Sequence, residues 1–167
     1  MIIKALILAA AMTATPPHEI TNPDPRHPNE EAVDAYVQAN ANAGATPFAE
    51  GALWTAFHGE AGLARIVDEL VDRSLADPRI SEIFKSHDMV RLRRTLKEQF
   101  CYLLNGGCDY SGRDMKAAHK DLGVQNADFN ALVEHLQVAM DHEKVGFRDQ
   151  NRFLAKLAPM QRTTVER

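Results

Sequence analysis

The chain has 167 residues, of which 45% are hydrophobic and 25% charged, a composition that fits one folded domain and excludes a disordered or fibrous chain. The formal net charge of −4 at pH 7, with no basic stripe, disfavours nucleic-acid binding, and no apolar run reaches the roughly 18 residues of a membrane-spanning helix. The two cysteines, Cys101 and Cys108, are too few for a disulfide-rich scaffold or for a zinc site built from cysteines.

Residues 1–14 have the order of a short secretory signal peptide. Lys4 precedes an apolar stretch, and small residues follow around Ala9 and Ala11, as in segments that are cleaved on export. We therefore expect export, with the periplasm as the compartment. The alternative is an ordinary apolar N-terminus on a cytoplasmic protein.

Residues 15–50 are predicted to form a Pro-rich arm, either a tether or a segment packed on the domain. They hold six of the eight prolines, and because proline removes backbone donors, the segment cannot be regular throughout. One short helix is expected around residues 30–38. The small residues from Asn40 to Ala45 indicate a flexible run.

Residues 51–167 are predicted to be helical throughout. Apolar residues recur at steps of three and four, which predicts helices over 63–75, 80–84, 89–104, 115–122, 126–140 and 148–159. Asp88 and Asn126 are expected to cap two of these helices, and glycines follow the helices that end near residues 104 and 122. Because no alternating strand pattern competes, the fold class is all-α.

His119 is the histidine whose surroundings stand out. Met115 and Leu122 share its helical face, and burying an imidazole without a partner is costly. The pattern alone leaves open a hydrogen-bonded core histidine or a metal ligand. His135 and His142 lie seven residues apart on one helix and are expected to form an exposed pair. The common hydrolase and nucleotide-binding motifs are absent.

The segment from about Ala52 to Val165 resembles the group I truncated haemoglobins. The matching blocks are GLARIVDELVDRSLADPRISEIF (62–84), MVRLRRTLKEQF (89–100), NGGCDYSGRDMKAAHKDLGV (105–124), DFNALVEHLQVAM (128–140) and LAKLAPM (154–160). The most specific match is the M-K-x-x-H segment that ends at His119, together with an aromatic residue, Phe84, 35 positions earlier. The resemblance covers about two-thirds of the chain.

This resemblance implies a globin-like two-over-two helical sandwich that binds haem b and reversibly binds a diatomic gas (oxygen, carbon monoxide or nitric oxide). It makes His119 the proximal ligand of the haem iron, with the other ring nitrogen donating to a carbonyl of its own helix. The residues expected around the haem are Phe84, Leu92, Thr95, Leu96, Phe100, Met115, Leu122, Val124, Phe129 and Val133. Arg113 and Lys116 are further candidates, for the haem propionates.

The expected distal side departs from the family pattern. Many relatives carry a tyrosine where this chain has Val71, and the distal helix offers Leu92, Thr95 and Leu96. Thr95, the single polar candidate, is expected to face outward or to bond its own helix. Without a distal donor, bound oxygen loses about 1–3 kcal/mol of hydrogen bonding, so we expect weak oxygen retention.

Other functions stay open. The domain could instead be a haem-free helical interaction module or a periplasmic haem protein of nitric oxide or redox chemistry. Nitric oxide dioxygenation would need an electron donor, and the sequence does not identify one. Cys101 and Cys108 flank a chain reversal that could bring their Cα atoms to the roughly 5.5 Å of a disulfide. If the protein is exported, either that bond or a buried thiol at Cys101 with a loop thiol at Cys108 stays open; in a reducing cytoplasm we expect free thiols.

Overall fold

The computed structural model describes residues 27–166, so the predicted signal peptide and the start of the arm lie outside the described residues. Within this range the chain is all-helical and contains no strand. In chain order the helices are η1 (Asn40–Ala43), α1 (Ala52–Ala56), α2 (Gly59–Ala76), α3 (Ser81–Phe84), α4 (Met89–Leu103), α5 (Met115–His119), α6 (Asn126–His142), α7 (Phe147–Leu157), η2 (Ala158–Met160) and α8 (Gln161–Thr164).

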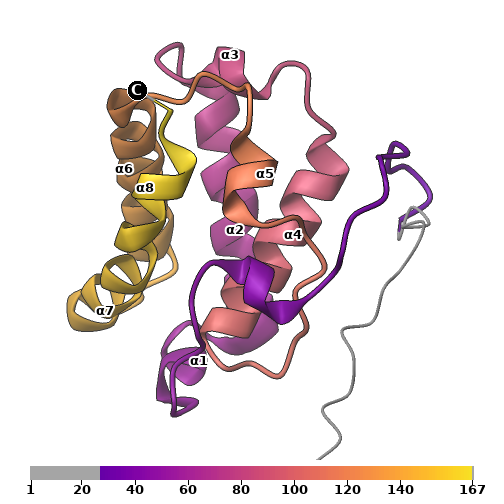
Figure 1. The fold of residues 1–167 in the computed structure, drawn as a ribbon. Helices are drawn as coiled ribbons and strands as arrows, with labels where there is room; N and C mark the ends of the chain where they lie inside the picture. The colour runs from indigo at the N-terminus through magenta and orange to yellow at the C-terminus, as the bar shows by residue number, and fades with distance from the viewer. Residues whose placement is uncertain (1–26, 167) are drawn as a thin grey trace, which may run out of the picture.

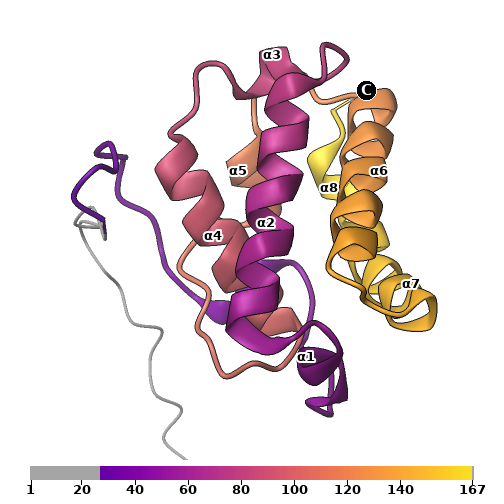
Figure 2. The same cartoon turned by 180° about the vertical axis from the view of Figure 1, so that it is seen from behind.

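Two helix pairs form the body of the domain. Helix α2 packs against α4, and α6 packs against α7, while α2 also runs along α6 and so joins the pairs. Figure 2 shows α2 between α4 and α6, and Figure 1 shows the short α5 on the opposite side of the molecule. The all-α fold predicted from the sequence is confirmed, and the pairs form the expected two-over-two arrangement.

The core forms where the apolar stripe of α2 meets its neighbours. Its members Leu63, Ile66, Val67, Leu70 and Val71 are at most 2% exposed. Phe153 of α7 lies edge-on to two further aromatic rings, with ring centroids 5.1 Å from Phe57 and 4.9 Å from Phe100. Edge-to-face pairs at this spacing are favourable beyond the area they bury. The end of α1, helix α4 and α7 are thereby locked together.

The arm differs from its prediction. Residues 30–38 are not helical, and the short 3-10 helix η1 begins at Asn40 instead. The run from Asn40 to Ala45 is packed rather than flexible, because Asn40 and Asn42 bond the loop of residues 104–114 and Ala43 is fully buried. Of the two alternatives for the arm, the described part is the packed one.

The helix ends differ from the prediction in several places, and α5 stops at His119 instead of reaching Leu122. Gln125, not Asn126, caps α6, because its side chain and that of Asp128 bond each other's backbone N–H groups in a capping box. Helical structure does not stop at residue 159 but continues through η2 into α8. Asp88 caps α4 as predicted, since its carboxylate accepts the N–H of Arg91 at 3.0 Å.

His135 is buried rather than one of an exposed pair. Its Nδ1 lies 3.2 Å from the hydroxyl of Ser74, and its Nε2 lies 3.0 Å from a carboxylate oxygen of Asp77. Both ring nitrogens thus have polar partners, which is what allows the ring to leave water. The seven-residue spacing of His135 and His142 could not predict this burial, because the partners of His135 come from the end of α2. No helix in the described range is long and apolar enough to cross a membrane.

Candidate functional site

A mainly apolar cavity of about 240 Å³ lies among α2, α3, α4, α5, α6 and the C-terminal helices. Eleven of the residues that the sequence analysis placed at the site line it: Phe84, Leu92, Thr95, Leu96, Phe100, Met115, His119, Leu122, Val124, Phe129 and Val133. These residues come from four helices and one loop, and the fold brings them to one space. That they contact haem remains a prediction.

Helix α5, which carries His119, is only five residues long and is fastened at both ends. At its start, the carboxylate of Asp114 accepts the N–H of Ala117 at 3.0 Å. Just beyond its end, the carboxylate of Glu166 accepts the N–H of Asp121 at 2.7 Å and of Gly123 at 2.9 Å. So short a helix is not stable by itself, and these bonds hold it against the cavity.

His119 is set in one tautomer. Its Nδ1 lies 2.7 Å from the backbone oxygen of Met115, and because a carbonyl can only accept, Nδ1 carries the proton. Burial lowers the pKa of His119 below its ordinary value, against a smaller opposing effect of the bond to Met115. Near neutral pH the ring is therefore neutral, and Nε2 presents a lone pair. The predicted bond to its own helix is confirmed.

Four other polar side chains that line the cavity are engaged in hydrogen bonds within the chain. Thr95 bonds the backbone oxygens of Arg91 and Leu92 on its own helix, at 2.9 and 3.2 Å, as the sequence predicts. Three more were not foreseen: the hydroxyl of Ser74 donates to Leu70, that of Tyr110 to Arg113, and the amide of Gln99 to Ala43. These side chains offer no spare O–H, and the Gln99 N–H groups face fixed acceptors.

Some lining residues were beyond the sequence analysis. Gln99 follows Leu96 by three positions, so its helical spacing could have placed it on the cavity face. Met160 has no such local signal, because it reaches the cavity from η2. The structure does not bring Arg113 or Lys116 to the cavity lining. Arg113 contacts the arm instead, with its guanidinium 5.3 Å from the ring centre of Tyr36.

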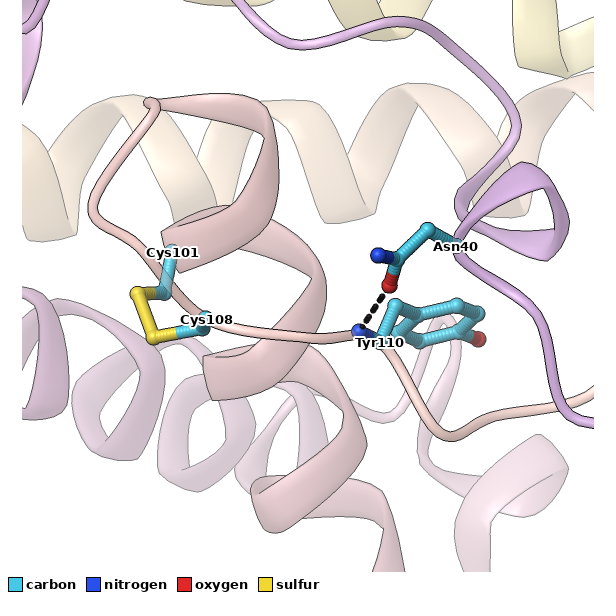
Figure 3. Close-up of a disulfide and its surroundings, with 4 residues drawn as sticks. All are labelled: Asn40, Cys101, Cys108 and Tyr110. Carbon is cyan, nitrogen blue, oxygen red and sulfur yellow. Dashed lines mark hydrogen bonds between the residues drawn. A yellow bond between two sulfur atoms is a disulfide. The ribbon is translucent and has the colours of Figure 1, made fainter. Parts of the chain in front are cut away.

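A disulfide fastens the loop that precedes α5. Cys101, near the end of α4, is bonded to Cys108, with their Cα atoms 5.7 Å apart. Figure 3 shows this disulfide together with Asn40 of the arm, whose side chain accepts the N–H of Tyr110 at 2.7 Å. The loop of residues 104–114 is thus held both by α4 and by the arm.

The donor set indicates which kind of metal the cavity could hold. Within residues 27–166, no three His, Cys, Asp or Glu side chains gather as a metal cluster. His119 is a fixed donor at a mainly apolar cavity, which fits a metal whose other ligands come from a prosthetic group. A large flat group such as haem meets both conditions.

Comparison with known proteins agrees with this geometry. The model of the bacterial-like globin family matches residues 52–166. A group 1 truncated haemoglobin of Tetrahymena thermophila is 30% identical over 92 residues, or 55% of this chain and 74% of that protein. The group 1 truncated haemoglobin GlbN of Nostoc sp. (strain MUN 8820) is 30% identical over 102 residues, or 61% of this chain and 86% of that protein.

Solved structures show the same fold. The Fe(III) form of the truncated haemoglobin from Tetrahymena pyriformis has a TM-score of 0.66 at 24% identity, over 69% of this chain and 98% of that chain. The 2/2 haemoglobin from Synechococcus sp. PCC 7002, in the cyanomet state with covalently attached haem, has a TM-score of 0.64 at 24% identity, with the same coverage. The protein therefore belongs to the bacterial-like globin family, as a truncated haemoglobin that binds haem and a diatomic gas.

Proposed function

We propose that the protein holds haem b with His119 as the proximal iron ligand and reversibly binds a diatomic gas on the opposite side. The observation that carries this proposal is the geometry of His119, whose Nδ1 lies 2.7 Å from the backbone oxygen of Met115 and whose side chain lines a mainly apolar cavity. This leaves Nε2 as the ring nitrogen free to bind a metal. When bound, the haem iron supplies the coordination position at which oxygen, carbon monoxide or nitric oxide binds.

The chain's own contribution is to hold the ring and exclude water. The apolar side chains of Phe84, Leu122 and Phe129 line the cavity around His119, and burying the porphyrin among them is favourable in proportion to the apolar area removed from water. The bond from Nδ1 to Met115 fixes the ring plane and raises the basicity of Nε2.

The distal side favours rapid release of oxygen. Val71, Leu92 and Leu96 line it without a donor, and the hydroxyl of Thr95 is spent on its own helix. Oxygen depends on such a donor more than carbon monoxide or nitric oxide does. The chain is therefore suited to exchanging a gas quickly rather than to storing oxygen.

We propose that the haem is not covalently attached. The chain has no C-x-x-C-H motif of the kind that attaches c-type haem, and both cysteines are bonded to each other. Extraction with acidified acetone should remove all of the haem, with the pyridine haemochrome spectrum of haem b. Haem that stays with the protein after extraction would overturn this part of the proposal.

We also propose that the protein works in an oxidising compartment after export. The bond between Cys101 and Cys108 supports this, since disulfides persist outside the reducing cytoplasm. Thiol titration of protein purified from each cell fraction without reductant tests it. The bonded form should be found in the periplasmic fraction, and a cytoplasmic protein with two free thiols would contradict it.

Absorption spectra of haem-supplied protein test the main proposal. The parent should show a Soret band that shifts when carbon monoxide is added to the ferrous form, and His119→Ala should lose the spectrum of histidine ligation. His142→Ala is the matched control, because that side chain is exposed and is bonded to Glu69 on the surface. A parent without a Soret band would leave a globin fold used as an interaction module, and an unchanged His119→Ala spectrum would exclude His119 as the ligand.

A further inference from the structure

The N-terminal arm, which precedes the segment matched by the family model, touches the helix that carries His119. Gly44 closes η1 with a φ of 84°, and a Cβ added there would lie 2.9 Å from Cγ of Met115 and 3.1 Å from Cε of Met160. The backbone of the arm therefore lies directly against the first residue of α5. Glycine meets both requirements, the left-handed conformation and the close approach.

Gln99 connects the same three segments from the other side. Its Nε2 donates to the backbone oxygen of Ala43 at 2.9 Å and lies 3.3 Å from Sδ of Met115 and 3.8 Å from Sδ of Met160. Because all three partners can only accept, the side-chain nitrogen of Gln99, and not its oxygen, must face them. Gln99 is 6% exposed and lines the cavity. It thus ties α4 to the arm at the level of α5.

Met115 passes this restraint to the histidine. Its side chain is held by Gly44 and Gln99, and its backbone oxygen is the acceptor that fixes Nδ1 of His119. A shift of Met115 would therefore tilt the imidazole or lengthen its hydrogen bond. Because α5 begins at Met115 and has only five residues, no helical turn precedes Met115 that could absorb such a shift.

The arm is itself anchored firmly enough to serve as a support. Asn40 bonds both Asp109 and the N–H of Tyr110, and Asn42 bonds the backbone oxygen of Gly112 at 3.2 Å. Upstream, the side chain of Glu30 is 0% exposed, and its carboxylate is paired with the guanidinium of Arg94 on α4. The arm is therefore fixed at Glu30 and again at Asn40 and Asn42, just before Gly44 contacts Met115.

We propose that residues 39–44 of the arm and Gln99 position the proximal histidine by holding Met115, so that the arm sets the bond between His119 and the haem iron. This inference rests on the proposed function and extends it to a segment outside the family match. Gln99 and Gly44 are positioning residues in this arrangement, and Gln99 acts through Met115 rather than as a donor to the gas.

Two pairs of variants test the proposal in the full chain. Gln99→Leu removes the amide that bonds Ala43, and Gln150→Leu is its control, because Gln150 is an equally buried amide that bonds Asp141 and Val145 and does not line the cavity. Gly44→Ala presses on Met115. Gly107→Ala is its control, because Gly107 has the same φ of 84° with nothing within 4 Å of the added Cβ.

The iron–histidine stretching band of the ferrous, gas-free protein is the principal measurement, by resonance Raman spectroscopy. It should shift or broaden in Gln99→Leu and Gly44→Ala and stay at the parent position in both controls. Haem transfer to apomyoglobin should be about three- to tenfold faster in Gln99→Leu, the size expected for one lost buried hydrogen bond, and should also be faster in Gly44→Ala. In haem-free protein, the amides of residues 115–119 should exchange faster in Gln99→Leu than in Gln150→Leu.

The outcomes separate this inference from the function on which it rests. A parent with a normal iron–histidine band and a Gln99→Leu variant with the same band and haem transfer rate would overturn the positioning role and leave the function intact. A parent without any iron–histidine band would overturn the function itself. Shifts of equal size in the variants and their controls would show a general loss of stability, which also contradicts a specific support.

Discussion

The two faces of α4 are built from different kinds of side chain. Toward the arm, Arg94 donates to Glu30, Glu98 and Ser111, and so joins the arm, the helix and the loop before α5. Toward the cavity, Leu92 and Leu96 are apolar, and the hydroxyl of Thr95 donates to a backbone oxygen of its own helix. The polar interactions of this helix thus hold the scaffold together, and Leu92, Thr95 and Leu96 offer no free donor to the cavity.

The largest effect is expected from breaking the arm side. Arg94→Met leaves the carboxylate of Glu30 buried without its main partner, and removing one member of a buried ion pair costs about 3–5 kcal/mol. Arg93→Met on the same helix is the control, because its partners Asp68 and Asp72 are 44% and 70% exposed and such pairs contribute about 0–1 kcal/mol. Denaturant unfolding measures both, and equal losses would contradict the account.

The disulfide comes next in size. Replacing both cysteines by alanine, in Cys101→Ala/Cys108→Ala, should lower the free energy of unfolding by about 2–3 kcal/mol, the loss expected for so short a loop. Denaturant unfolding with and without reductant gives the value. Reductant should destabilise the parent and leave the double variant unchanged. A parent that is insensitive to reductant under conditions that open the bond would show that the bond carries no stability.

The arm side should also respond to acid. The hydrogen bond from Arg94 lowers the pKa of Glu30 below the ordinary glutamate value of 4.5, although burial opposes it. Because the pKa is lower in the folded state, the stabilisation is complete above pH 4.5 and is lost as the pH falls through the folded value. Glu30→Gln should flatten the dependence of unfolding free energy on pH in that acid range. An unchanged slope would mean that Glu30 is not held as a charge.

The smallest effect is expected on the cavity side. Thr95→Val keeps the shape of the side chain and removes a hydroxyl that already donates to the backbone oxygens of Arg91 and Leu92. The rate of oxygen dissociation should therefore stay at the parent value, as followed by stopped-flow mixing with carbon monoxide. A clear acceleration in Thr95→Val would show that this hydroxyl serves the gas after all.

The periodicity of the sequence was enough to predict the helices that bury one face. The stripe from Leu63 to Val71, the cap at Asp88 and the His119 face are local patterns, and the structure has each of them. The arm could not be predicted in this way, because its conformation depends on partners such as Arg94 and Tyr110 that lie far along the chain.

The candidate site was foreseen where its residues share a helical face. Leu92, Leu96 and Phe100 are such residues, and Gln99 belongs to the same helix but was passed over because it is polar. Its burial makes sense only once the backbone oxygen of Ala43 is beside it. Ser74 and His135 were missed for the same reason, since each is buried by virtue of the other.

The rate of oxygen dissociation from the ferrous protein tests the central claim most directly, namely that His119 holds a haem in a cavity without distal donors. We predict rapid release by the parent and a rate about tenfold or more slower in Leu96→Gln, which adds an amide donor of similar size to the cavity wall. Leu75→Gln, at an exposed position on α2 outside the cavity lining, should match the parent. Slow release by the parent that Leu96→Gln does not slow further would contradict the account.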